Sequence, residues 1–287
     1  MQFNDQKKGM FMAFIAVMFI TPDSLFIRLA SVSSWNLIFY RGFIPFTLVF
    51  IGLLIVYKNN LIKKVFSTGW HGVSYAFVFS VTNITFVISI ENTNVANTLI
   101  MIALAPMLSA VLSFLFLKET PDNKTWVAIT VTTLSVVYIF YDALDAGDML
   151  GNALGLLTAL GLAICAVIAR SAKKIDLVPA AMFGKLLVAL IAFYFADNLN
   201  LKGNDLTIVP LMCVMCVAIP FVLVTIAPRY ITAAEVNLFF LLETILGPIW
   251  VWLVISEQPS FETIIGGSVI FVTIACHSAL SLKEHNN

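Results

Sequence analysis

The sequence predicts an all-α polytopic membrane protein whose ten transmembrane helices form two inverted five-helix repeats around a central cavity. Its 287 residues are 60% hydrophobic and 11% charged, with a mean hydropathy of +0.98. Soluble proteins carry about 25% charged residues, so this composition excludes a soluble fold. Polar clusters divide the chain into ten apolar runs, and the two halves of the chain share sparse matches. A net charge of zero gives no indication of a nucleic-acid partner, and the lipid bilayer is the expected surrounding.

Each apolar run has about the 18–25 residues that a hydrocarbon core of roughly 30 Å requires. We expect spans at residues 9–28, 34–57, 69–90, 94–117, 124–141, 149–170, 177–196, 206–227, 232–255 and 261–281. The first run is too long for a signal peptide and lacks a small-residue cleavage site, so it is interpreted as an uncleaved helix. The connections are short, which predicts a single membrane domain.

The distribution of Lys and Arg predicts the orientation. With the N-terminus in the cytoplasm, twelve of these residues fall in cytoplasmic segments and two, Arg28 and Lys202, in outer ones. Positive residues concentrate on the cytoplasmic side. The sequence therefore predicts a multi-pass protein of the cell (inner) membrane with both termini cytoplasmic. The acidic segment 142–148 falls outside.

Matches between the halves indicate a duplication, with repeats at residues 1–145 and 146–287. Glu119 and Pro121 coincide with Glu257 and Pro259 at one offset, and at another Gly9, Arg28 and Gly42 coincide with Gly151, Arg170 and Gly184. Five spans per repeat is an odd number, so the copies must be inverted. Inverted repeats are typical of secondary transporters that hold substrate near the midplane.

Glu243 lies in the middle of the ninth span. A carboxylate at this depth costs about 2.5–3.5 kcal/mol, so it must face water, a partner charge or a ligand. Gly247 and Trp250 follow one and two turns later on the same helical face, and Pro248 leaves the carbonyl of Thr244 without its helical donor. The pattern favours a substrate or proton site. A protonated Glu243 bonded to a neighbouring helix is the alternative.

Asp23 and Arg41 lie at similar depth in two consecutive spans, which predicts an ion pair. The pair could be structural, or it could open as an extracellular gate that meets a zwitterion. Pro22 precedes Asp23, and Pro45 follows Arg41 by four residues, so both helices could bend there.

Other polar residues within the spans extend the candidate site. Lys185, central in the seventh span, is either a partner for Glu243 or a ligand for an anionic group, while Glu235 lies nearer a helix end. Tyr40 and Asn83 are candidate cavity residues or interhelical contacts. Pro22, Pro106, Gly247 and Pro248 are the candidate hinges. Gly266-Gly267 indicates close packing, and a homodimer is one arrangement that would provide it. Cys213-x-x-Cys216 is interpreted as two small buried residues rather than a redox or metal half-motif.

The chain resembles the EamA-like family of the drug/metabolite transporter superfamily. The resemblance is carried by the spacing of Pro106 and Glu119, by Arg41-Gly42, and by LLETILGPIWVWLVISE in span nine. It implies ten helices in inverted repeats, a central cavity, alternating access and metabolite export, with substrates that differ across the superfamily. One departure is that Glu243-Thr244 stands where the first copy has Ala105-Pro106.

The predicted function is secondary transport of a small polar organic solute, such as an amino acid or an organic amine. Three acids within the spans (Asp23, Glu235, Glu243) against two bases (Arg41, Lys185) favour a cationic or zwitterionic solute. Proton coupling or exchange would drive transport, with Glu243 as the first coupling candidate and Asp23 as the second. No cofactor or metal site is predicted and no enzymatic motif is present. The alternatives are a membrane-embedded enzyme, a channel, and a carrier for organic anions or nucleotide-linked metabolites.

Overall fold

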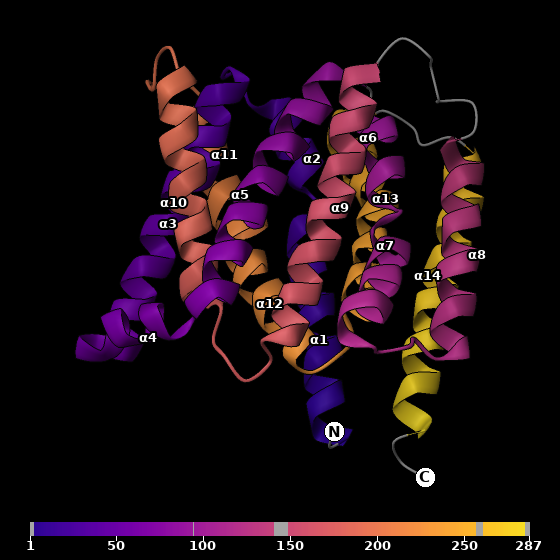
Figure 1. Cartoon of the computed structure of the whole chain (residues 1–287). Coiled ribbons are helices and arrows are strands. Elements are labelled where there is room, and N and C mark those ends of the chain that lie inside the picture. Colours follow the sequence, from indigo (N-terminus) through magenta and orange to yellow (C-terminus); the bar gives the residue numbers. More distant parts are fainter. Residues whose placement is uncertain (1–2, 94, 141–148, 257–260, 285–287) are drawn as a thin grey trace.

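The computed structural model describes residues 3–93, 95–140, 149–256 and 261–284, and every regular element in these residues is a helix (Figure 1). Its α-helices are α1 (Phe3–Ile20), α2 (Asp23–Leu29), α3 (Ser34–Tyr57), α4 (Leu61–Ser67), α5 (Gly69–Asn92), α6 (Val95–Ile102), α7 (Ala105–Leu112), α8 (Asn123–Phe140), α9 (Met149–Ser171), α10 (Val178–Phe195), α11 (Asp205–Met212), α12 (Ile219–Ile226), α13 (Ala233–Ile255) and α14 (Phe261–Glu284).

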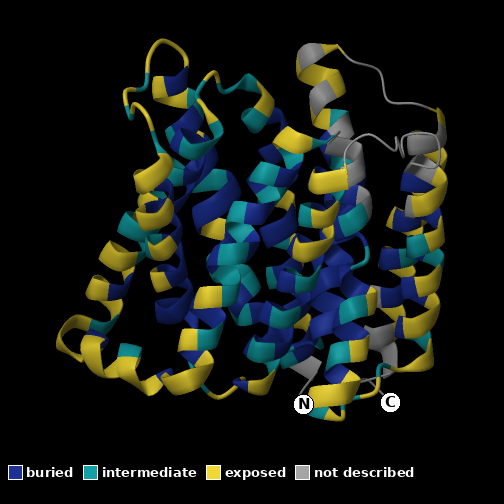
Figure 2. Ribbon diagram, turned by 45° about the horizontal axis from the view of Figure 1, so that its top comes forward, coloured by how far each residue is buried: buried dark blue, intermediate teal, exposed yellow. Residues whose placement is uncertain are grey.

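Helices occupy all ten of the expected ranges. Seven helices or helical runs among the described residues are long and apolar enough to cross a membrane, and shorter apolar helices cover Ala105–Leu117 and Ile264–His277. Exposed residues lie on the outer surface and at the ends of the bundle (Figure 2). Many of them are large apolar side chains, of which Phe193 is 60% and Ile55 69% exposed. The chain is therefore a multi-pass membrane protein.

Two of the spans are interrupted beside a proline. The first changes from α1 to α2 at Thr21-Pro22, and the fourth changes from α6 to α7 at Ala103-Leu104, just before Pro106. Proline has no N–H to donate, so the helical hydrogen-bond ladder weakens at these points. Pro248, in contrast, lies inside the continuous helix α13.

The two halves of the chain interleave. The most extensive helix contacts join α5 with α9 and α3 with α10, and each pair takes one helix from each half. The α5–α9 contact depends on glycine, because a Cβ built on Gly161 would lie 2.0 Å from Oγ1 of Thr82. Helices α8 and α14 pack on each other at one side of the bundle (Figure 1).

The first helices of the two repeats run in opposite directions. Arg170, near the end of α9, donates to the carbonyl of Pro228 at 3.4 Å, and Gly9, early in α1, packs against the adjoining Tyr230 and Ile231. The end of α9 and the beginning of α1 therefore share one end of the bundle. Figure 1 places both chain termini at this end. This is the relationship that an inverted repeat requires.

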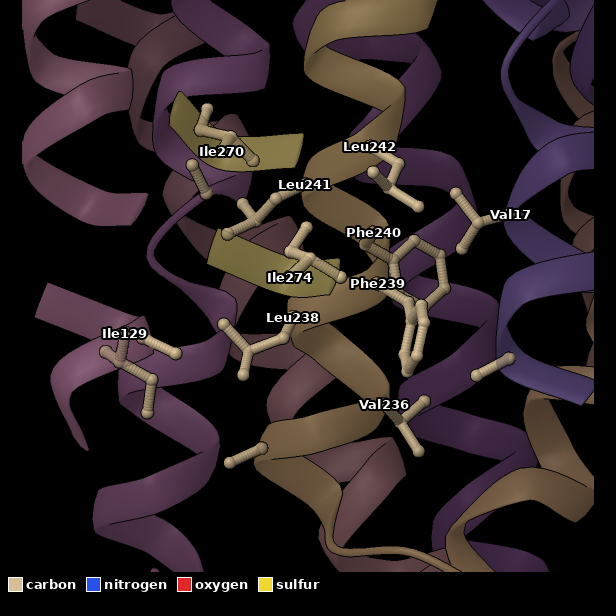
Figure 3. Close-up of a cluster of buried hydrophobic side chains, with 14 of the residues drawn as sticks. Val17, Ile129, Val236, Leu238, Phe239, Phe240, Leu241, Leu242, Ile270 and Ile274 are labelled. Atoms are coloured by element: carbon tan, nitrogen blue, oxygen red, sulfur yellow. The ribbon is translucent and has the colours of Figure 1, made fainter. Parts of the chain in front are cut away.

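The largest apolar core surrounds the first half of α13. Leu238, Leu241 and Ile270 are each no more than 2% exposed, and Figure 3 shows them with side chains from α1 and α8. A Cβ on Gly267 would lie 2.9 Å from Cγ2 of Ile245. The close packing expected at this glycine is therefore contact between α14 and α13 within one chain.

Candidate functional site

A cavity of about 120 Å³ lies in the middle of the bundle, between helices of both repeats. Four charged side chains line it: Asp23 from α2, Arg41 from α3, Lys185 from α10 and Glu243 from α13. The remaining lining is mostly apolar and aromatic. A few fixed charges in an apolar cavity are typical of a binding site for a small polar molecule.

Asp23 and Arg41 form a bidentate ion pair, as the sequence predicts. Nη1 of Arg41 lies 2.6 Å from Oδ1 of Asp23, and Nη2 lies 2.8 Å from Oδ2. The break after Ile20 makes Asp23 the first residue of α2, where the helix dipole favours a negative charge. Both residues are buried, and their charges cancel.

Glu243 contributes an unpaired carboxyl group. The residue is 6% exposed, and its Oε1 finds no hydrogen-bond partner among the residues that the structure describes. The core around the first half of α13 fixes this helix and therefore the depth of Glu243. An unpaired polar atom at a buried position is costly, and a ligand that donates to it would remove that cost.

Lys185 contributes an ammonium group that has no carboxylate partner in the described part of the chain. The residue is 1% exposed, and its Nζ donates to Oδ1 of Asn83 on α5. The ring centroids of Phe79 and Phe221 lie 5.1 and 5.7 Å from Nζ, which is within cation–π range. The alternative in which Lys185 pairs directly with Glu243 is therefore wrong for this structure.

Two predicted cavity residues lie elsewhere. The Tyr40 hydroxyl donates to the carbonyl of Leu199, and Nε1 of Trp250 donates to Oγ1 of Thr21 at 2.9 Å. Neither residue lines the cavity. Trp250 shares a helical face with Glu243, but two turns of helix separate them by about 10 Å along the axis. Asn83, in contrast, lines the cavity as expected.

Glu235 is a helix cap rather than a cavity residue. Its carboxylate accepts from the N–H of Thr232 at 2.8 Å, and the Thr232 hydroxyl accepts from the N–H of Glu235 at 3.2 Å. This reciprocal arrangement is a capping box at the start of α13. The cavity therefore contains two acids and two bases, and the anionic excess expected from the sequence is absent from its lining.

The sequence did not reveal the aromatic lining. Phe79, Phe86, Phe221 and Phe240 face the cavity. With 24 phenylalanines in the chain, composition could not separate these four from lipid-facing ones. The one signal in the sequence was the position of Lys185 in the middle of an apolar span, because an ammonium group there needs an acceptor or an aromatic face.

The comparisons with known proteins agree with this architecture. The EamA-like transporter family matches residues 7–141 and again residues 149–279. A solved structure described as "Crystal structure of protein" is similar with a TM-score of 0.79 and 15% identity, covering 96% of this chain and 98% of that chain. At this identity the likeness shows the fold alone. No curated protein matches the sequence. Because the family match spans nearly the whole chain in two copies, the protein belongs to the EamA-like transporter family.

Proposed function

We propose that this protein is a secondary transporter for a small zwitterionic organic solute, such as an amino acid. The observation that carries the proposal is the state of the four cavity charges. Asp23 and Arg41 neutralise each other, whereas Glu243 and Lys185 form no ion pair with each other or with any other described residue. One unsatisfied acid and one unsatisfied base match a solute that carries one group of each sign.

In this mode of binding the solute's ammonium donates to Oε1 of Glu243. Its carboxylate accepts from Lys185, which Asn83 and the two flanking rings hold in place. The apolar part of the solute packs on the phenylalanines of the lining. Charge-assisted hydrogen bonds in a dry cavity are stronger than neutral ones, so both groups contribute to affinity and to orientation.

Transport follows from alternating access. The interruptions beside Pro22 and Pro106 allow half-helices to tilt, and the bare backbone at Gly247 with Pro248 allows α13 to bend. We place the protein in the cell (inner) membrane with both termini cytoplasmic, and export is the direction expected for its family. A proton gradient or exchange supplies the driving energy, with Glu243 as the coupling group.

Counterflow in proteoliposomes tests this function. Vesicles loaded with a mixture of α-amino acids are diluted into single radiolabelled amino acids, and the amines and carboxylic acids that each lack one charged group serve as competitors. Saturable counterflow in which an amino acid competes at least tenfold better than either analogue supports the proposal. Preference for the acid alone would instead indicate an organic-anion carrier, and a current that does not saturate would indicate a channel.

Two cavity variants and a matched control sharpen the experiment. Glu243→Gln and Lys185→Met each remove one charge, so each is expected to lower counterflow at least tenfold. Tyr40→Phe removes a polar group outside the cavity and is expected to keep counterflow. Equal counterflow rates in the wild type and these three variants would contradict a binding role for the charges of Glu243 and Lys185.

A further inference from the structure

A line of buried polar side chains begins at the contact between α7 and α13 and continues into the turn that follows α7, and we refer to it as the α7–α13 line. Ser109 is 0% exposed, Asn237 is 2% exposed and Ser113 is 4% exposed. Nδ2 of Asn237 donates to Oγ of Ser109 at 2.6 Å and to the carbonyl of Ala233 at 3.2 Å. Oγ of Ser113 finds no partner among the described residues. Ser109 and Ser113 are four residues apart and therefore share a helical face.

This line lies between the cavity and one end of the bundle. On α13, Glu243 follows Asn237 by six residues, and Phe240 between them lines the cavity together with Glu243. At the other end, the carbonyl of Ser113 accepts from the N–H of Glu119 at 3.3 Å. The Glu119 side chain is 35% exposed and lies 3.0 Å from Nε of Arg170. A buried carboxyl group and a half-exposed one thus mark the two ends of the line.

The hydrogen-bond pattern leaves capacity for water along this line. Ser109 accepts from Asn237, and no acceptor for its own hydrogen is present among the described residues. Ser113 Oγ and Glu243 Oε1 are also unpaired there. Buried polar groups of this kind are usually satisfied by internal water. The rise of an α-helix separates Asn237 from Glu243 by about 9 Å, a gap that water would have to bridge.

We propose that the α7–α13 line is the route by which protons pass between Glu243 and the solution at the end of the bundle that holds the termini. The inference rests on the proposed coupling role of Glu243. In one transfer the Glu243 carboxyl loses its proton and becomes a carboxylate. Each water and serine hydroxyl takes a proton on its oxygen and releases its own, and the solution beside Glu119 receives the last one. Asn237 is a positioning residue, because its amide holds the oxygen of Ser109.

The charged surroundings of Glu243 are consistent with this route. The charged groups that line the cavity with it are Asp23 on α2, Arg41 on α3 and Lys185 on α10, and the thiol of Cys216 lines the same cavity. Asp23 and Arg41 cancel, and Lys185 is held by Asn83. None of these groups forms a hydrogen bond or ion pair with Glu243 among the described residues, so a proton released there has no acceptor within the cavity that is already bonded to it.

The experiment follows the protonation of Glu243 directly. Purified, lipid-reconstituted protein is subjected to a pH jump, and the carboxyl C=O stretch is recorded by infrared difference spectroscopy, with Glu243→Gln identifying the band. In Ser113→Ala and Asn237→Leu, the rate at which this band changes after the pH jump is expected to fall at least tenfold, while its final amplitude stays the same. Ser113→Thr, which retains a hydroxyl, is expected to restore the rate.

The control is Thr132→Val on α8. Thr132 is buried, and its hydroxyl bonds only to carbonyls of its own helix, so its replacement should leave the rate unchanged. Equal rates in wild type, Ser113→Ala and Asn237→Leu would overturn the route and leave Glu243 as the coupling group. Slowing of Thr132→Val to the same extent would also overturn it. If no protein shows a Glu243 band, the coupling role itself fails, while the binding role is still measured by counterflow.

Discussion

The ammonium of Lys185 donates to the side-chain oxygen of Asn83, and these two residues come from opposite halves of the chain. Nearby, Gly42 packs against the backbone of Lys185 and Ala189, which fixes α10 against α3. The cavity is therefore assembled by contacts between the repeats, and its cation is held by an amide instead of a carboxylate. An amide leaves the positive charge of Lys185 uncompensated and available to an anionic group.

Asn83→Leu is expected to destabilise the protein. The change removes the acceptor of a fully buried ammonium group, and an unsatisfied buried donor costs about 1–3 kcal/mol, with more for a charged group. Thermal unfolding in detergent measures the loss. The double variant Asn83→Leu/Lys185→Met should regain most of it, because the charge is removed together with its acceptor. A double variant less stable than Asn83→Leu would contradict this role for Asn83.

The Asp23–Arg41 pair gives a second prediction. Asp23→Asn and Arg41→Ala each leave one buried charge without its partner, which costs about 3–5 kcal/mol. The double variant should lie closer to wild type than the sum of the two single changes, in a double-mutant cycle based on the free energy of unfolding. Additive losses would show that the two side chains do not depend on each other.

Glycine at position 161 is expected to be required for the α5–α9 contact. Gly161→Ala places a Cβ 2.0 Å from Oγ1 of Thr82 and should cost about 1–3 kcal/mol of unfolding free energy. The matched control is Gly52→Ala on α3, where an added Cβ meets nothing within 4 Å. This control should be neutral or slightly stabilising, since alanine favours helix by up to about 1 kcal/mol. Equal effects of the two changes would contradict the close approach of α5 and α9.

Cysteine labelling tests the predicted orientation. In a background with the exposed Cys276 changed to serine, Lys202→Cys should react with a membrane-impermeant maleimide in intact cells. Lys63→Cys should react only after lysis. Both lysines are exposed in the structure, so accessibility within the protein does not limit either reaction. The opposite pattern would invert the predicted topology.

Much of the fold could be predicted from the sequence because a bilayer imposes one strong rule on helix length and polarity. Each of the ten ranges contains helix in the residues that the structure describes, whereas the short helix α4 lies in a connection where the sequence predicted none. The interruptions near Pro22 and Pro106 follow from the missing proline N–H. The segment 142–148 and the positions of Glu257 and Pro259 lie outside the described residues, so the predictions made for them stay predictions.

The candidate site was only partly predictable. The sequence identified the four charged residues of the cavity, Asp23, Arg41, Lys185 and Glu243. A charged side chain within an apolar span is costly unless it meets a partner charge, water or a ligand, so each one marks a candidate site. A helical periodicity gives the angle of a residue on its own helix and does not give the neighbours at its depth. For that reason Trp250 was predicted in the cavity, which it does not line, and for Tyr40 the alternative of a contact with another segment is the one observed. Glu235 lies near a helix end as predicted, but its capping bond to Thr232 could not be predicted because it depends on where α13 begins.

The central claim is that Glu243 and Lys185 together bind a zwitterion. Equilibrium binding of radiolabelled α-amino acids to purified protein, measured by scintillation proximity, tests this claim most directly. Wild type and Tyr40→Phe should bind at least one amino acid saturably, and Glu243→Gln and Lys185→Met should each weaken that binding at least tenfold. Unchanged affinity in both cavity variants, alongside a correctly folded protein, would contradict the claim.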